Sequence, residues 1–324
     1  MKIVFFGSAN FSIPSLKALL ENGYQVVCVV TQPDKQKGRG LNLSATTVKT
    51  FAKESRLEVY QPININAQEC VSSLKGLHAD IFVVIAYGQL LSPEILSLPA
   101  IMPLNAHASI LPKYRGAAPI NWALINGDKK TGVSIMKIIA QVDAGAVIAQ
   151  RPLDILGDDN FLTLEARLAK LAAELLLVAI KDIANSKHKL TPQDESKVTF
   201  APKLKKDNGL IDWNKSAQDI YNLIRGSLIW PGAFTYFKSK LLKIYKAQVC
   251  DTRSDKANAK PGEIIGISKQ GILVATSCGG LLIEELQLEG KRKMSAEEFI
   301  NGHKIKAGEK LTKNRTFLPC NNTN

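Results

Sequence analysis

Blocks of apolar residues alternate with amphipathic stretches along the first part of the chain. The first block, at 2–7, predicts a buried parallel strand, and the next stretch, at 11–22, predicts a helix that ends at Gly23. A second apolar block follows at 25–31. A strand, a helix and a strand in this order form a right-handed crossover, so the pattern predicts a doubly wound, mostly parallel sheet of the α/β class.

The same alternation continues as far as residue 186. The strand predicted at 80–88 ends in Gly88, at the carboxyl end where parallel sheets present ligands. The stretch at 161–186 has the apolar stripe of a long amphipathic helix. The other elements predicted are helices at 45–55 and 67–75 and strands at 59–60, 104–107, 131–138 and 147–155.

The pattern changes in the last third of the chain. Pro192 and Pro202 lie in a stretch without a clear period, which is typical of a linker. Beyond it, a short helix is predicted at 211–228, and short apolar strands separated by glycine turns predict a small β-barrel. The predicted strands are 234–250, 262–266, 271–276 and 280–286. The resulting division is a first domain at 1–189, a linker at 190–207 and a second domain at 208–324.

The composition agrees with a globular protein of two domains, because the 324 residues are 45% hydrophobic and 22% charged. No apolar run approaches the roughly 20 residues that a membrane-spanning helix needs. The amino terminus passes directly into the first strand pattern, without the features of a signal sequence. We therefore expect a cytoplasmic protein without a membrane partner, and we expect a monomer.

Cysteine and histidine usage gives no indication of a metal centre. The five cysteines are far apart and include no CxxC pair, and of the four histidines only His107 has polar neighbours. We therefore expect free thiols and no bound metal. The first turn, at 7–11, lacks the GxGxxG pattern, so a dinucleotide cofactor is not supported.

The charge balance is strongly basic, with a formal net charge of +13. An excess of Lys and Arg favours a polyanionic partner such as nucleic acid, because cationic side chains displace the counterions of the phosphates. Many basic proteins bind no nucleic acid, so charge alone leaves both interpretations open.

The segment at 103–120 concentrates the polar chemistry of the chain. If its first part is extended, Asn105 and His107 lie on the same face of a strand, because successive side chains of a strand alternate. An amide donor beside a titratable imidazole suits chemistry on a carbonyl group. An Asn-x-His pair is nevertheless more often an ordinary loop or core-edge pair, and spacing alone does not decide between the two.

The run at 104–120 reads Leu-Asn-Ala-His-Ala-Ser-Ile-Leu-Pro-Lys-Tyr-Arg-Gly-Ala-Ala-Pro-Ile and resembles the signature of the folate-dependent formyltransferases. These proteins typically read Asn-x-His, then Ser-Leu-Leu-Pro, then Arg-Gly-Ala-Ala-Pro. Ala106, Ala108 and Ile110 depart from the usual residues, but each change leaves the polar atoms in place. The resemblance implies a Rossmann-like formyltransferase domain followed by an OB-like β-barrel domain that grips tRNA.

The activity implied by this resemblance is transfer of the formyl group of 10-formyltetrahydrofolate to the α-amine of methionyl initiator tRNA. Asn105 and His107 would donate hydrogen bonds to the developing oxyanion. Asp143 matches the family's Asp-small-Gly position and would orient His107, although an Asp in such a turn is by itself usually a turn former. The resemblance implies no metal.

The resemblance also implies binding residues for both substrates. Lys113 and Arg115 would steer either the folate glutamate tail or a tRNA phosphate, while the stretch at 115–119 also fits a simple helix entry. The tRNA-binding residues implied lie in a basic loop, which composition alone would make a solvated surface loop: Lys35, Lys37 and Arg39. The folate pocket implied is lined by Ser109, Ile110, Leu111 and Pro112 and by the strand tip of Ala86, Tyr87 and Gly88.

Two other interpretations stay open at this point. A formyltransferase of the same fold would act on a small amine such as a sugar nucleotide or glycinamide ribonucleotide, although such a substrate needs neither the basic loop nor a basic second domain. A tRNA-binding protein without catalysis is the alternative from another class, and the complete set of Asn105, His107 and Asp143 argues against it.

Overall fold

The structure, a computed structural model, describes residues 1–37, 42–251 and 259–315. The chain forms two compact units. The first consists of 1–119, 129–155 and 162–202, and the second of 120–128, 156–161 and the described residues from 203 onward. The segment at 190–207, expected to be a linker, contributes to both units, because its residues up to Pro202 belong to the first unit.

The first unit is built on a seven-stranded sheet within the described residues. Its strands lie in the order β5 (Val59–Tyr60), β2 (Gln25–Val30), β1 (Lys2–Gly7), β6 (Ile81–Ile85), β7 (Met102–His107), β8 (Lys130–Lys137) and β9 (Val147–Asp154). The pairs from β5 to β7 are parallel, and β8 and β9 are antiparallel additions. The predicted doubly wound, mostly parallel sheet is confirmed.

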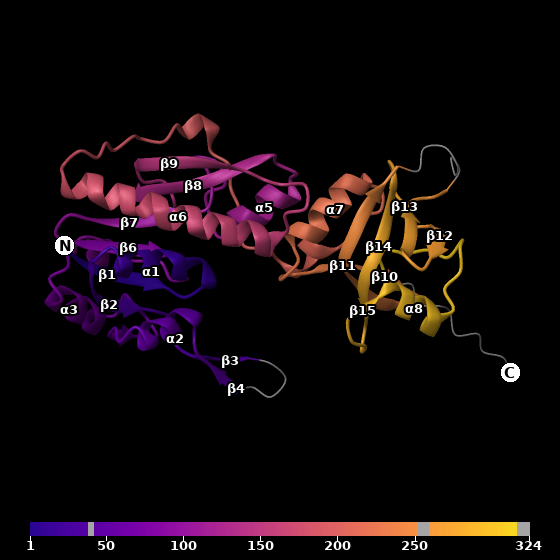
Figure 1. Cartoon of the computed structure of the whole chain (residues 1–324), viewed down its shortest axis with the longest axis horizontal. Coiled ribbons are helices and arrows are strands. Elements are labelled where there is room, and N and C mark those ends of the chain that lie inside the picture. The colour runs from indigo at the N-terminus through magenta and orange to yellow at the C-terminus, as the bar shows by residue number, and fades with distance from the viewer. Residues whose placement is uncertain (38–41, 252–258, 316–324) are drawn as a thin grey trace. The chain divides into compact units, whose positions relative to one another are not determined.

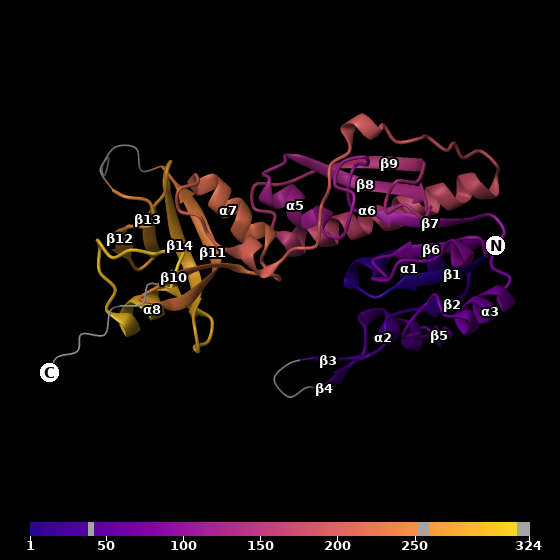
Figure 2. The ribbon, with the colours of Figure 1, turned by 180° about the vertical axis from the view of Figure 1, so that it is seen from behind.

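Helices connect these strands, and both faces of the central strands are buried. Val4 and Phe6 lie in one apolar cluster with residues of α3 (Gln68–Gly76) and α4 (Pro93–Leu96), while Ile3 and Phe5 are buried on the opposite face. The other helices include α1 (Ile13–Glu21), α2 (Thr47–Glu54) and α6 (Phe161–Ala184), and α6 runs alongside β7 and β8 in both views (Figures 1 and 2). A short helix, α5 (Pro119–Ile125), follows the segment that carries the Asn-x-His pair.

The second unit is an antiparallel sheet. Its strands lie in the order β10 (Ala233–Phe237), β11 (Lys240–Cys250), β14 (Gly280–Leu288), β13 (Gly271–Ala275) and β12 (Ile264–Ser268), and β15 (Met294–Ser295) also pairs with β14. A segment near Leu311 joins the two edges: Tyr236 and Thr312 exchange backbone hydrogen bonds of 2.9 Å, and Leu311 N–H donates to Gly262 O at 2.8 Å. The predicted domain of short antiparallel strands is confirmed, and these bonds give it barrel-like closure.

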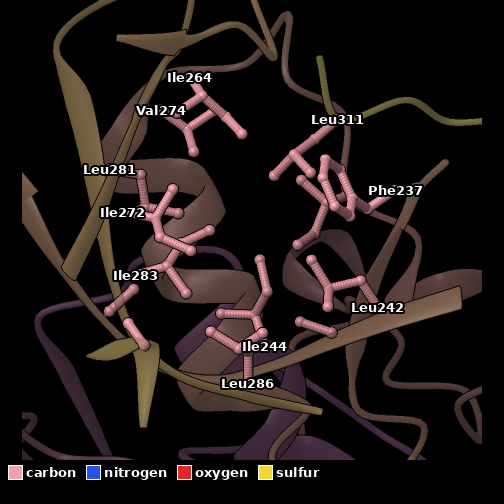
Figure 3. Packing of buried hydrophobic residues seen from close by; sticks show 14 of the residues in the cluster. Phe237, Leu242, Ile244, Ile264, Ile272, Val274, Leu281, Ile283, Leu286 and Leu311 are labelled. Atoms are coloured by element: carbon pink, nitrogen blue, oxygen red, sulfur yellow. The ribbon is translucent and has the colours of Figure 1, made fainter. Parts of the chain in front are cut away.

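The core of the second unit follows from the period of two along its strands. Leu242 and Ile244 of β11, and Ile272 and Val274 of β13, are nearly or wholly buried and point into the same cluster (Figure 3). The helices α7 (Ala217–Gly226) and α8 (Ala296–His303) add Ile220 and Phe299 to this cluster. Within the described parts of the chain, no helix combines the length and the apolar character needed to cross a membrane.

Candidate active site

Asn105 and His107 lie two positions apart on β7, between parallel β6 and antiparallel β8. The carboxylate of Asp143, in the loop after β8, approaches both of them. Asn105 Nδ2 donates to Asp143 Oδ1 at 3.3 Å, and His107 Nδ1 lies 3.6 Å from Asp143 Oδ2. The structure therefore brings together the three residues that the sequence resemblance singled out, around one carboxylate.

The hydrogen bonds of His107 define where its proton sits. His107 Nε2 lies 2.9 Å from the carbonyl oxygen of Tyr114. Because a carbonyl oxygen only accepts, Nε2 carries a hydrogen and donates it. The other nitrogen, Nδ1, faces Asp143, so a second proton on the ring would make this approach an ion pair. The side chain of His107 is 7% exposed, which keeps these contacts away from bulk water.

Asp143 is held in an unusual backbone conformation. Its φ of +51° lies in the left-handed region, which costs energy for a residue with a side chain. Gly116 N–H donates to Asp143 Oδ2 at 2.8 Å. Two positions on, a Cβ on Gly145 would lie 1.7 Å from the carbonyl oxygen of Lys137, so this position has room only for glycine. The turn is thus packed tightly against the end of β8.

The residues proposed for one folate wall are fixed by an internal hydrogen-bond network. Ser109 Oγ donates to Lys113 O at 2.6 Å, and Ser134 Oγ donates to Ser109 O at 2.6 Å. Leu111 N–H in turn donates to Ser134 Oγ at 3.0 Å. Ser109 and Leu111 are buried, while Ile110 and Pro112 are half-buried. Of this group, Ile110 and Pro112 therefore offer the most surface to a ligand.

The strand tip after β6, at 86–88, exposes mainly backbone to solvent, because its one large side chain is buried. Ala86 and Gly88 are exposed and have positive φ angles of +48° and +92°. The Tyr87 ring points the other way, into the apolar cluster, and its hydroxyl has no hydrogen-bond partner among the described residues. Burial raises the pKa of Tyr87 above its usual value. Ser8 fixes the tip, because its hydroxyl donates to Tyr87 O at 2.9 Å.

The basic loop is described only at its base. Lys35 is exposed on β3 (Lys35–Lys37), which pairs with β4 (Asn42–Ser44) in a hairpin that the sequence pattern did not predict. Lys37 lies at the end of β3, and Arg39 lies outside the described residues. At the base, Asp34 accepts from Gln61 and Lys49 at 2.8 and 2.6 Å, and these bonds lower its pKa.

Arg115, Gln193 and Glu195 form a hydrogen-bonded group next to the site that the sequence did not identify. Arg115, whose role the sequence left open, is 3% exposed and donates to the side chains of Gln193 and Glu195, so its guanidinium is bound within the protein. Its charge is already compensated, and the contact lowers the pKa of Glu195. Lys113 is exposed and can still meet an anion. Gln193 and Glu195 lie in the stretch without a period, so no pattern distinguished them.

No group of three or more His, Cys, Asp or Glu side chains in the described residues is arranged to hold a metal ion.

The fold and this constellation define the chain's class. The model of the formyl transferase family matches residues 1–180, and that of the formyl transferase C-terminal domain matches residues 203–304. The chain belongs to the formyltransferase family. Among curated relatives it is 43% identical to the methionyl-tRNA formyltransferase of Acetivibrio thermocellus, over 96% of this chain and 99% of the relative. It is 44% identical to that of Caldanaerobacter subterraneus, over 95% and 99%.

Solved structures share the fold at lower identity. An N-formyltransferase from Helicobacter canadensis, in complex with folinic acid and dTDP-3-aminofucose, has a TM-score of 0.66 and 18% identity over 91% of this chain and 100% of its own. HypX from Aquifex aeolicus, in complex with tetrahydrofolic acid, has a TM-score of 0.62 and 17% identity, covering 93% of this chain. The chain spans about half the length of HypX, 47%. These likenesses establish the fold.

Proposed function

We propose that the chain transfers the formyl group of 10-formyltetrahydrofolate to the α-amino group of methionyl initiator tRNA. The observation that carries this proposal is the meeting of Asn105, His107 and Asp143 around one carboxylate. This site lies in a chain that matches methionyl-tRNA formyltransferases over nearly its whole length. Charged initiator tRNA is a cytoplasmic molecule, so the proposal places the chain in the cytoplasm. We also propose that the chain acts as a monomer.

One of the two amide hydrogens of Asn105 is available for the reaction. Its amide nitrogen carries two hydrogens, and one of them is directed at Asp143 Oδ1. The second donates to the oxyanion that forms when the methionine amine attacks the formyl carbon. A fixed donor of this kind stabilises the charge that develops in the transition state, by roughly 3 kcal/mol in other acyl-transfer sites.

His107 supplies the second donor by exchanging its hydrogen-bond partner. Its Nε2–H is directed at Tyr114 O, and it moves to the oxyanion as negative charge develops there. Asp143, whose Oδ2 lies 3.6 Å from His107 Nδ1, keeps the ring in its orientation. As the new C–N bond forms, the bond between the formyl carbon and N10 of the folate breaks.

The proton balance runs through Asp143. The incoming amine loses one proton, and N10 of the departing folate gains one. Asp143 Oδ2 already accepts from Gly116 N–H, whereas Oδ1 accepts only the longer bond from Asn105. Oδ1 is therefore the oxygen that takes the amine proton through a water molecule and returns it toward N10.

The two substrates occupy different parts of the first unit. The folate lies against Ile110 and Pro112 and against the backbone of Ala86 and Gly88, with Tyr87 holding the tip from the core side. The half-buried apolar side chains and the two exposed backbone positions support this placement. The tRNA is contacted by the basic loop that carries Lys35, Lys37 and Arg39.

The test is a formyl-transfer assay with charged initiator tRNA. We expect His107→Ala, Asp143→Ala and Asn105→Ala each to lower kcat by about 100-fold or more, because each removes a donor or the group that orients one. Asn66→Ala is a matched control, since the Asn66 amide also joins two loops, donating to Leu90 O at 3.0 Å and accepting from Ser92 N–H at 2.8 Å. Thermal unfolding shows that each variant is folded.

Two results would contradict the proposal. Wild-type turnover in folded His107→Ala and Asp143→Ala proteins would remove the site assignment. Faster transfer to an amino sugar nucleotide or to glycinamide ribonucleotide than to charged initiator tRNA would instead identify a small-amine formyltransferase.

A further inference from the structure

The backbone of the turn that carries Asp143 is bound by one side chain, that of Gln193. Gln193 Nε2 lies 2.8 Å from the carbonyl oxygen of Asp143 and 2.8 Å from that of Gly145. An amide nitrogen carries two hydrogens, so Gln193 supplies one to each carbonyl. One side chain therefore spans the turn on both sides of Ala144.

Arg115 fixes which way the Gln193 amide points. Gln193 Oε1 accepts from Arg115 Nε at 3.0 Å and from Arg115 Nη2 at 2.9 Å. A guanidinium only donates and carbonyl oxygens only accept, so a flipped amide would face like groups on both sides. Glu195 completes the arrangement, because its two carboxylate oxygens accept from Arg115 at 2.7 and 3.1 Å. The orientation of Gln193 is thus determined by its partners.

The loop at 114–116, which contains Arg115, also contacts the catalytic groups His107 and Asp143. Tyr114 O accepts from His107, and Gly116 N–H donates to the Asp143 carboxylate. Arg115, between these two residues, acts on the backbone of Asp143 through Gln193. The carboxylate and the carbonyl of one residue are therefore both fixed from residues 114–116, by separate routes.

Gln193 is not needed to attach its own segment to the unit. Thr191 exchanges backbone hydrogen bonds of 2.8 and 2.9 Å with Val147. Further along, Arg115 N–H donates to Thr199 O at 2.9 Å, and Ala201 N–H donates to Arg115 O at 2.7 Å. Because backbone bonds hold the segment on both sides of Gln193, the contact of its side chain with the turn requires another explanation.

We propose that Gln193 is a positioning residue for formyl transfer: oriented by Arg115 and Glu195, it holds the turn at Asp143 so that the carboxylate stays between Asn105 and His107. This inference rests on the proposed function. The turn needs such support because Asp143 has a left-handed backbone, with φ at +51°, and would otherwise relax. A small displacement of a catalytic group lowers the rate steeply, by about 100-fold for about 1 Å.

Gln193→Glu is the decisive variant. A glutamate still accepts hydrogen bonds from Arg115, but it cannot donate to Asp143 O and Gly145 O and places negative charge beside them. Gln193→Met keeps the length and removes both functions. We expect both variants to lower kcat by about 10- to 100-fold, with KM for folate and for tRNA within about twofold of wild type.

A second readout does not depend on activity. Gly116 N–H is bound to the Asp143 carboxylate, so displacement of Asp143 exposes this amide. We expect hydrogen exchange of the Gly116 amide to become about tenfold faster in Gln193→Glu and to stay unchanged in Asn66→Ala. If Gln193 only stabilised its own segment, its substitution would not specifically accelerate exchange of the Gly116 amide.

The outcomes are distinct. A folded Gln193→Glu with kcat within about twofold of wild type and unchanged exchange at Gly116 would overturn the inference. Failure of both Gln193 variants to fold would make Gln193 a structural residue and would also overturn it. If the wild-type chain itself transfers no formyl group, the proposed function fails, while the exchange of Gly116 still reports whether Gln193 positions Asp143.

Discussion

Asp143 is the side chain on which the geometry of the site depends most. Its carboxylate receives a hydrogen bond from Asn105, faces the ring of His107 and accepts from the backbone of Gly116. Its carbonyl accepts from Gln193. A residue with so many partners can keep a left-handed backbone, because the surrounding groups hold it more strongly than the strain drives it to relax.

At this residue scale, Gly145→Ala should show how closely the turn is packed. The added Cβ would lie 1.7 Å from Lys137 O, so the turn or the end of β8 must move. We expect the free energy of unfolding to fall by about 1–3 kcal/mol and kcat to fall with it, because Asp143 moves with the turn. Urea unfolding and the formyl-transfer assay measure the two effects.

The matched control for this change is Gly76→Ala. Gly76 ends α3, and a Cβ there would meet nothing within 4 Å. Alanine also favours a helix more than glycine does, so we expect stability to be unchanged or slightly higher. Equal losses of stability in Gly145→Ala and Gly76→Ala would show that the close packing around Gly145 does not cause the effect.

The sequence predicted the catalytic candidates but not the groups that hold them. Asn105 and His107 share a strand face, and the family motif added Asp143 from a different element. Gln193 could not be found in this way, because a single amide in a stretch without a period has no recognisable neighbours. The role of Arg115 stayed open because the sequence shows a charge but not its burial or its partner Glu195.

At the scale of elements, helices and strands with a strong hydrophobic pattern were predicted well, and those with a weak pattern were not. The apolar strands β1 and β6 were expected within a few residues of their observed ends, because burial on both faces leaves a continuous apolar run. The β3–β4 hairpin and the one-turn helix α4 were not predicted. Their residues are polar or few, so neither element produces a repeat that a pattern can detect.

Helix α8 is an element whose start depends on local hydrogen bonds. Ser295 Oγ accepts from Glu298 N–H at 3.2 Å, and Glu298 Oε2 accepts from Ser295 N–H at 3.1 Å, which is a capping box. We expect Ser295→Ala to lower the free energy of unfolding by about 1 kcal/mol, because one N–H of the first turn loses its acceptor. Thermal unfolding of the full chain measures this loss.

Ser73→Ala provides the comparison for this change. The Ser73 hydroxyl donates to Glu69 O within its own helix and also contacts the Tyr60 side chain, so its removal leaves no helix terminus without a partner. We expect a change well below that of Ser295→Ala. A loss of equal size would argue against the cap as the source of the effect.

At the scale of the whole molecule, the two units have separate cores and share a net charge of +13. A small folate needs little of this charge, whereas a tRNA brings many phosphates. The proposed tRNA contacts therefore predict a rate that depends on salt through the KM for tRNA and much less through the KM for folate, since released counterions drive only the polyanion's binding.

Lys35→Ala and Arg39→Ala test this division between the substrates. Each removes one cation from the basic loop, so we expect each to raise the KM for charged initiator tRNA and to reduce its salt slope by about one unit, with the KM for folate unchanged. Lys75→Ala, which removes an exposed cation from the end of α3, is the control and should leave both KM values as they are. An equal rise of both KM values in the loop variants would contradict this prediction. It would show that the loop supports the fold of the first unit rather than recognition of tRNA. The tRNA contacts would then have to be sought among the cations of the second unit.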